Sequence, residues 1–459
     1  MAPRTILAPW RHAISGVGAL MLIVFLATTL SAGGSQAKVF DPKHFVLDNG
    51  LELVVIEDRR RPAVAHYVYY RVGAMDETPG KTGLAHFLEH LMFKGTKTLA
   101  PGEFSRRVAR HGGQDNAFTS QDMTAYHQVI AADRLEMVME MEADRMTGLQ
   151  LDEAITLAER DVVLEERLSR VESRPAGVLG EALGATLYLS HPYRRPVIGW
   201  EPEIRALNFE DALAFYRRWY MPNNAIVVIV GDVSATDALV MARRTYGKIP
   251  AGTLPPRLQH AEPDQRAPRR VALTDARVRQ PNWRRLYVAP AYDGDARQPY
   301  ALDVLSEILG GDTGRLHKSL VVGQKRAISA TFWYDGRGRD FGSSGLYGLP
   351  AAGVDLAELE AAFDAEIAIL MADGVTDDEV DAAKRRLVAQ AVFARDSLAG
   401  PARIVGGTLA IGQTVEDLEA WPERIKAVTR AEVDAAIKAL FRPNFSATGL
   451  LLPAGEPPS

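Results

Sequence analysis

The sequence contains no cysteine among its 459 residues. Disulfide bonds and thiolate metal ligands are therefore excluded, and any metal ion must be held by imidazole and carboxylate groups. The chain also lacks an excess of basic residues, because 53 lysines and arginines are set against 58 aspartates and glutamates, a formal net charge of -5. Such a chain offers no broad basic surface, so we expect no nucleic acid partner.

The first 37 residues differ in composition from the rest of the chain. Arg4 and Arg11 precede an apolar stretch at 14–30, and Ser35-Gln36-Ala37 supplies small residues at the positions of a cleavage site. This order predicts a secretory signal peptide over residues 1–37. The alternative is an uncleaved membrane anchor, because an apolar stretch of about 17 residues reaches the lower limit for a spanning helix. We expect a periplasmic or secreted bacterial protein that keeps no membrane span after cleavage.

The two halves of the chain end in similar ways. Pro222 precedes an apolar stretch at 225–230, and Pro443 precedes another at 447–452. A repeat at about half the length suggests two copies of one α+β unit, and the length itself favours two domains. A polar, proline-rich stretch without periodicity separates the copies. The predicted parts are an N-terminal domain at 38–249, a linker at 250–270 and a C-terminal domain at 271–455.

The apolar residues of 83–93 recur at the spacing of one face of a helix. His86, Glu89 and His90 fall on the opposite face. Side chains four positions apart lie one above the other, so both imidazoles can meet one metal ion, and Glu89 can polarise a water on it. This is the H-x-x-E-H arrangement, the reverse of the H-E-x-x-H motif of zinc peptidases. The alternative is the solvated face of an ordinary amphipathic helix.

A third metal ligand is expected in a long helix predicted at 152–171. Glu159 and Glu166 fall within an apolar stripe of this helix, where a carboxylate needs a cation, a hydrogen bond or a proton. The two lie about 10 Å apart along the helix axis, too far for both to bind one ion. The apolar members of the stripe are Ile155, Val162 and Val163.

We predict that Glu166 is the metal ligand and that Glu159 orients one of the ligating histidines. Glu165 projects about 100° away from Glu166, so we expect it on the surface. The alternative is that Glu159 and Glu166 only form salt bridges with Arg160, Arg167 or a neighbouring helix.

Taken together, these residues resemble the pitrilysin/insulinase-type peptidases, also called inverzincins, which are related to the mitochondrial processing peptidase. Residues 86–90 form the H-x-x-E-H motif, and Glu166 follows after 75 intervening residues, a spacing specific to the family. The match covers essentially the whole mature chain, although the second half matches mainly by pattern and length. Further matching segments are 112–119, His191-Pro192-Tyr193, 220–224 and Gly231-Asp232.

The resemblance implies an α+β fold of two homologous domains, each a mostly antiparallel sheet flanked by helices. It implies one zinc ion per chain, held by His86, His90 and Glu166 in the N-terminal domain only, with Glu89 as the general base. Asn116 and Ala117 match the family's edge strand, which holds a peptide substrate by strand addition. Without the family, these two residues would be assigned to an ordinary strand after a Gly-Gly turn.

The leading hypothesis for function is a zinc endopeptidase that acts on peptides or unfolded segments. A second hypothesis is a non-catalytic core or assembly subunit of the same fold, although such proteins usually lose motif residues that are all present here. A third is a processing enzyme dedicated to one peptide in coenzyme or quinone formation. Ser/His/Asp and Cys/His chemistry do not compete, because cysteine is absent and no Gly-x-Ser-x-Gly segment occurs.

One segment departs from the family pattern. Many catalytic members carry an arginine and a tyrosine seven residues apart in the C-terminal half, and these residues grip the substrate. Aligned on Leu320, the two positions here hold Val321 and Ile328, which donate no hydrogen bond to an oxyanion. We therefore expect a heterodimer with a homologous zinc-less subunit that carries the Arg/Tyr pair. The alternative is that Arg326 or Tyr334 supplies the contact.

Overall fold

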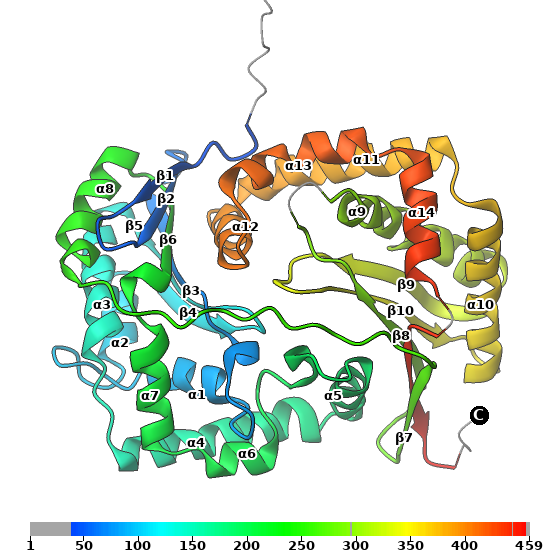
Figure 1. Ribbon diagram of the computed structural model, residues 1–459, viewed down its shortest axis with the longest axis horizontal. Coiled ribbons are helices and arrows are strands. Elements are labelled where there is room, and N and C mark those ends of the chain that lie inside the picture. The colour runs from blue at the N-terminus through cyan, green and yellow to red at the C-terminus, as the bar shows by residue number, and fades with distance from the viewer. Residues whose placement is uncertain (1–37, 294–295, 443, 456–459) are drawn as a thin grey trace, which may run out of the picture. The chain divides into compact units, whose positions relative to one another are not determined.

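The computed structural model describes residues 38–455 except 294, 295 and 443. The described chain from Lys38 onward belongs to one compact unit, in which two β-sheets are surrounded by helices (Figure 1). The predicted signal peptide, residues 1–37, lies outside the described residues. Within the described part of the chain, no helix combines the length and the apolar character needed to cross a bilayer.

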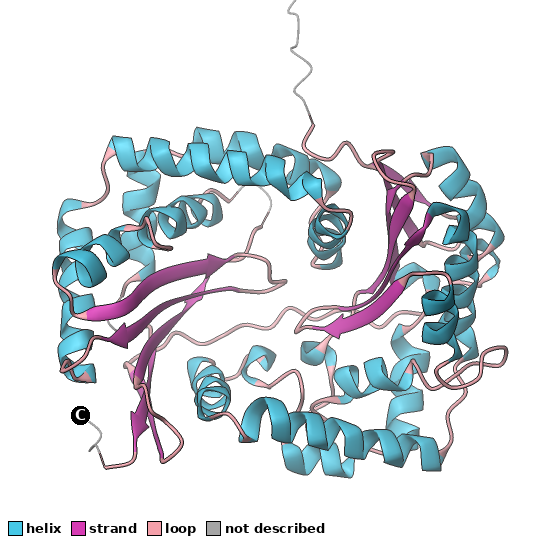
Figure 2. Cartoon of the chain, turned by 180° about the vertical axis from the view of Figure 1, so that it is seen from behind, coloured by secondary structure: helices cyan, strands magenta, loops and turns pink. Residues whose placement is uncertain are grey.

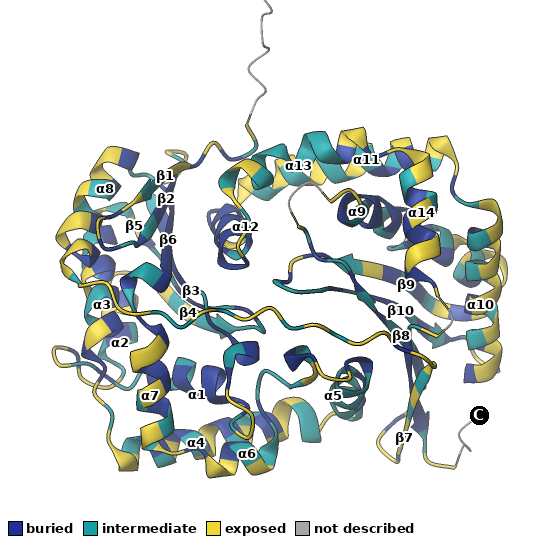
Figure 3. Ribbon diagram, in the orientation of Figure 1, coloured by how far each residue is buried: buried dark blue, intermediate teal, exposed yellow. Residues whose placement is uncertain are grey.

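The first sheet has six strands in the order β1-β2-β6-β3-β5-β4. β2 and β6 pair in parallel, and the other neighbours are antiparallel. The central strands β3 and β6 are buried over almost their whole length, because both faces of the sheet are covered (Figure 3). The strands are β1 (Lys43–Val46), β2 (Glu52–Glu57), β3 (Ala63–Tyr70), β4 (Gln114–Thr119), β5 (Thr124–Ala131) and β6 (Ala225–Gly231).

The second sheet has five strands in the order β7-β11-β8-β10-β9, with β7 and β11 parallel and the rest antiparallel. Apart from β1, the first sheet has the same topology, since β2 to β6 take the places of β7 to β11 in chain order. The predicted α+β fold with two related, mostly antiparallel sheets is confirmed. The strands are β7 (Arg269–Asp275), β8 (Asn282–Ala289), β9 (Ala327–Asp335), β10 (Gly342–Pro350) and β11 (Ala447–Pro453).

The described part of the first half contains eight α-helices and that of the second half six. Those of the first half are α1 (Leu84–Leu91), α2 (Glu103–Arg110), α3 (Leu135–Gly148), α4 (Glu153–Arg167), α5 (Pro175–Leu187), α6 (Glu201–Ala206), α7 (Phe209–Trp219) and α8 (Ala235–Arg244). Those of the second half are α9 (Gln298–Leu309), α10 (Leu356–Asp373), α11 (Asp377–Phe393), α12 (Ala399–Ala410), α13 (Val415–Ala427) and α14 (Arg430–Leu440).

One helix of each half covers the sheet of the other half (Figures 1 and 2). Helix α12 packs on β3 and β6, and its Val405 shares a buried cluster with Tyr69 of β3. Helix α5 packs on β7 and β11, and its Leu179 shares a buried cluster with Leu451 of β11. Each sheet therefore completes its core with side chains from the opposite half.

The loop between β9 and β10 also reaches the first half. Nε2 of the fully buried His191 lies 3.0 Å from Oδ2 of Asp340, and Arg339 is 3.2 Å from Asp76. The extended chain between Lys248 and Arg269 forms no helix or strand and runs beside this contact, where the His260 amide donates to Asp340. Since β7 begins at Arg269, the last two residues of the predicted linker belong to a strand.

Candidate metal centre

Helix α1 begins at a glycine that has two steric reasons to be there. Gly83 adopts φ 87°, a left-handed conformation, and a Cβ at this position would lie 2.5 Å from the carbonyl oxygen of Ile198. Both carboxylate oxygens of buried Glu77 accept hydrogen bonds from the amides of Gly83 and Ala85. A carboxylate at a helix N-terminus pairs with the orphan amides and the helix dipole, so the start of α1 is fixed.

The helix predicted at 83–93 is confirmed, although α1 itself ends at Leu91. Its apolar residues, including Phe87 and Leu88, are fully buried in the first core. The opposite face carries His86, Glu89 and His90, as the spacing predicts.

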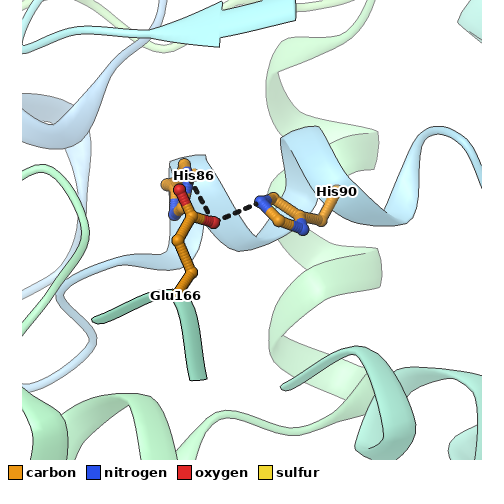
Figure 4. Close-up of side chains that lie close together, drawn as sticks. All are labelled: His86, His90 and Glu166. Carbon is orange, nitrogen blue, oxygen red and sulfur yellow. Dashed lines mark ion pairs between the residues drawn. The ribbon is translucent and has the colours of Figure 1, made fainter. Parts of the chain in front are cut away.

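Glu166 of α4 faces both histidines of α1 (Figure 4). Its Oε2 lies 3.0 Å from Nε2 of His90 and 3.6 Å from Nε2 of His86. The neighbouring Glu165 is exposed and takes no part in the cluster. The other oxygen of Glu166 pairs with Arg170, one helical turn further on, at 2.7 Å.

Glu159 lies on the other side of the His90 ring. Its Oε1 is 3.0 Å from Nδ1 of His90, and its Oε2 pairs with Lys94, which follows α1. Of the partners named in the salt-bridge alternative, Arg160 and Arg167 are not used, because Arg160 binds backbone carbonyls and Arg167 binds Glu181. Both glutamates do pair with side chains on or beside the neighbouring helix α1, as that alternative also allowed.

The apolar stripe predicted around Glu159 is only partly correct. Val163 is fully buried beside Glu159, but Val162 is 48% exposed. The buried face of α4 is instead partly polar, because it also contains Thr156 and Arg167.

Burial and pairing give the ionisable groups of the cluster different protonation tendencies. Burial lowers the pKa of His86 to about 3, so its imidazole is neutral with a lone pair available. Burial also opposes the charged form of His90, but the hydrogen bond that its Nδ1 donates to Glu159 and the nearby carboxylates outweigh burial and raise the pKa of His90. Burial raises the pKa of Glu89, although the hydroxyl of Thr119 donates a 2.6 Å hydrogen bond to its Oε2.

The donor set suits a zinc ion. Two imidazole nitrogens and one carboxylate oxygen, from His86, His90 and Glu166, lie within 4.8 Å of one another. Zinc binds such atoms at about 2.0–2.2 Å, and catalytic sites use three protein ligands and leave a fourth position open. Glu159 is placed to fix the orientation of His90, whereas Nδ1 of His86 has no hydrogen-bond partner among the described residues.

Comparisons with known proteins agree with this geometry. Residues 53–201 match the insulinase family, peptidase family M16, and residues 206–387 match the domain described as the peptidase M16 inactive domain. The zinc protease PqqE of Helicobacter pylori is 36% identical over 313 residues, which cover 67% of this chain and 70% of that protein. The chain belongs to peptidase family M16.

Solved structures of M16 peptidases share the fold. A protease from Helicobacter pylori matches with a TM-score of 0.83 and 28% identity, over 90% of this chain and 99% of that one. The periplasmic protease PqqL from Escherichia coli matches at 20% identity with a TM-score of 0.76, over 90% of this chain but only 47% of its own. The same fold therefore forms about half of a longer chain in that protein.

Asn116 and Ala117, the residues expected to bind the peptide, lie on β4. This strand is at the edge of the first sheet, so one side of it pairs with no other strand of the sheet. Asn116 is exposed, and its side-chain oxygen accepts a hydrogen bond from the Ala117 amide. Thr119, which binds Glu89, is the last residue of the same strand.

Four side chains that contact the histidine cluster or helix α1 were not predicted from the sequence. Arg170 follows Glu166 by four residues, so helical spacing could have revealed it. Thr119 reaches Glu89, and Lys94 reaches Glu159, only through the tertiary fold. Glu77 lies shortly before α1, but no local pattern marks it as the acceptor for the first amides of the helix.

Proposed function

We propose that the chain is a zinc-dependent endopeptidase that hydrolyses peptides or unfolded segments, with His86, His90 and Glu166 as zinc ligands. The observation that carries this proposal is the approach of one carboxylate oxygen of Glu166 to Nε2 of both histidines, with Glu89 on the same helix face. The family's relatives are named zinc proteases, which supports the same chemistry.

Each residue of the cluster has a defined task in this proposal. A bound zinc ion would acidify a water and polarise the scissile carbonyl. Glu89 accepts the proton of the attacking water at its carboxylate and later delivers it to the leaving amine. Thr119 holds one oxygen of Glu89 in place, and Glu159 holds the ring of His90. The open edge of β4 at Asn116 and Ala117 binds the peptide in an extended form.

The experiment combines metal analysis with a peptidase assay on the same preparations. The purified chain should contain about one zinc ion, as three good ligands predict. A chelator should abolish hydrolysis, and added zinc should restore it. Glu89→Gln should retain the zinc but lose about 10²–10⁴-fold in rate, because it removes the base and keeps the ligands. Full zinc content without hydrolysis, with or without a homologous subunit, would instead support a non-catalytic assembly role.

The proposal includes a second, zinc-less homologous subunit. Val321 and Ile328 are apolar, and Ile328 is 56% exposed on β9. Of the two alternative donors, Tyr334 already donates its hydroxyl hydrogen to the Pro290 carbonyl at 2.7 Å, and Arg326 is a surface residue 3.5 Å from Glu358. Loss of one oxyanion donor costs about 10²–10³ in rate, so the chain alone should be a poor enzyme.

The two-subunit proposal is tested by assaying the pure chain with and without the homologue. We expect the homologue to raise the rate by about 10²-fold or more. Full activity of the chain alone, at dilutions where it is monomeric, would contradict the proposal. In that case Arg326→Ala would show whether Arg326 is the missing donor.

The proposed location is the periplasm or the cell exterior. The Escherichia coli neighbour PqqL is described as periplasmic, although it shares only the fold with this chain. N-terminal sequencing of the protein from its native host should find Lys38 as the first residue. An intact N-terminus in the membrane fraction would indicate an anchor instead.

A further inference from the structure

A cavity of about 490 Å³ lies between α9, α11, α12, α13 and the end of β9, and Val39 and Phe40 of the first half also line it. None of its lining residues belongs to the histidine cluster or to the proposed peptide-binding strand. This volume is within the range of sites that bind small molecules, roughly 300–1,000 Å³. The cavity is therefore large enough for a ligand of its own.

The position of the cavity follows from the repeat. In chain order, α9 and α11 are the counterparts of α1 and α4, which carry the histidine cluster, and α9 contacts α11 as α1 contacts α4. Neither α9 nor α11 contains a histidine. Among the described residues, no three histidine or carboxylate groups near these two helices come close enough together to hold a metal ion. The second half thus has a space between these helices, but the side chains that line this space are not metal ligands of the kind found between α1 and α4.

Aromatic rings form much of the wall. Tyr292 and Tyr300 lie with ring centroids 5.3 Å apart, and Phe40, Tyr334 and Trp421 also line the cavity. Aromatic faces attract organic cations through the ring quadrupole, and cages of such rings recognise ammonium groups. The walls therefore favour a cation with some apolar surface.

Of the carboxylates that line the cavity, all but one form an ion pair with an arginine among the described residues. Arg386 pairs with Glu307, Arg337 with Asp335, and Arg424 with Asp417. Arg337 is also the only basic side chain among the described lining residues.

Asp303 is the remaining carboxylate. Its Oδ2 accepts hydrogen bonds from two neutral donors, the Tyr292 hydroxyl and the Trp421 indole at 3.2 Å. Its Oδ1 accepts no hydrogen bond from the described residues. Burial raises the pKa of Asp303 to about 7, because the neutral donors only partly compensate its charge. Among the described residues, the carboxylates that line the cavity therefore outnumber their cationic partners by one.

We propose that this cavity binds an organic cation, an ammonium or guanidinium group on an apolar stem, whose charge pairs with Oδ1 of Asp303. The stem lies among the rings of Tyr292, Tyr300 and Trp421. Such a group is either a free small molecule or the basic side chain of a peptide, and the two sources share this chemistry.

The test is calorimetric titration of the full chain carrying Glu89→Gln, so that no peptide is hydrolysed. One arm compares pentylammonium with the neutral pentanol. The other compares a blocked alanine-lysine-alanine tripeptide with the same peptide carrying norleucine instead of lysine. We expect at least one cation to bind about 10-fold or more tightly than its neutral analogue, since a charge-assisted contact contributes at this level. The arm that responds identifies the source.

A matched pair of further variants locates the binding site. Asp303→Asn keeps the shape of the side chain and should weaken cation binding about 10- to 100-fold. Glu307→Gln alters another carboxylate of the same cavity, which already has Arg386 as its partner, and should leave binding within about 3-fold. The comparison of charged with neutral probes uses the chain in which Asp303 is unchanged. It therefore remains decisive even if Asp303→Asn folds poorly. Equal binding of cation and neutral analogue, no binding of any cation at about millimolar concentration, or equal loss in both variants would overturn the proposal.

Discussion

Glu165 and Glu166 are neighbours in the sequence, yet only Glu166 faces the histidines. A rotation of about 100° per residue separates the two side chains, so one reaches the cluster and the other reaches solvent. The sequence could predict which of the two faces the histidines, because the helix and the apolar stripe around its carboxylates are both visible in the local sequence. It could not supply Thr119, which lies on β4, or the pairing of Lys94 with Glu159, which forms only because α4 packs beside α1.

This pair of glutamates provides a matched test of the metal site. Glu166→Gln should lower zinc affinity by about 10–100-fold or more, because an amide oxygen is a much weaker ligand than a carboxylate. Glu165→Gln should leave the zinc content unchanged. Zinc per chain is measured after dialysis against a weak chelator. Equal zinc loss in both variants would show that the ligand assignment is wrong.

Asp303 should make stability depend on pH. Its pKa of about 7 in the folded protein exceeds the ordinary value of 3.8, so the folded state binds the proton more tightly than the unfolded state. The free energy of unfolding should therefore fall as pH rises from about 4 to about 7, by roughly 4 kcal/mol at most. The neighbours that act on this carboxyl are Tyr292 and Trp421 as donors, Arg337 as a cation and Asp335 as an anion.

Urea unfolding at several pH values measures this effect. Asp303→Asn should remove the fall, so its stability relative to the unchanged protein should increase between pH 4 and pH 7. Asp417→Asn is the contrasting variant, since hydrogen bonds from Thr414 and Arg424 outweigh burial and lower the pKa of Asp417. The stability that Asp417 contributes is complete above about pH 5, so that variant should be less stable than the unchanged protein by a constant amount from about pH 5 to pH 7, and the difference should shrink only at lower pH. Parallel pH profiles for all three proteins would contradict the assignment.

At the scale of elements, α12 shows what hydrophobic periodicity can and cannot reveal. Most of its apolar residues are buried, but a local pattern of apolar residues does not say which sheet a helix covers. Helix α12 packs closely on β3 at Gly406, where a Cβ would lie 2.0 Å from the ring of Tyr69. The next residue, Gly407, has open space around it.

Alanine substitutions at these adjacent glycines measure two different contributions to stability, the packing of α12 on β3 and the helix propensity of the residue. Gly406→Ala should destabilise the protein by about 1–3 kcal/mol, because the methyl group must displace the Tyr69 ring or the helix. Gly407→Ala should stabilise it by about 0.5–1 kcal/mol, because alanine is the better helix former and meets no neighbour. Thermal unfolding of both variants measures the difference. A stabilised Gly406→Ala variant would mean that α12 does not pack on β3 in solution.

At the scale of the molecule, the loop from β9 to β10 connects the two halves near α1. Asp340 binds His191 and the His260 amide, and Arg339 binds Asp76, which directly precedes Glu77 at the start of α1. In the sequence, Asp340-Phe341-Gly342 belongs to no motif that would indicate a role for it. Its role depends on a contact across nearly 150 residues, which neither composition nor periodicity could predict.

Asp340→Ala should destabilise the protein by about 1–3 kcal/mol, because it leaves the buried Nε2 of His191 and the His260 amide without their acceptor. Asp335→Ala, at the end of β9, should cost less than about 1 kcal/mol, since Asp335 pairs with Arg337 on the surface. Denaturant unfolding compares the two variants. A larger loss for Asp335→Ala would contradict the role assigned to the loop.

The reciprocal placement of α5 and α12 gives the chain the topology of a domain-swapped dimer whose two protomers have been joined by a tether. Each sheet depends on a helix encoded in the other half of the gene. A cut in the extended stretch between Lys248 and Arg269 would break no helix or strand. The two fragments should then remain associated, and two separate genes encoding them should complement each other. The tether therefore acts mainly by setting the effective concentration of one half near the other.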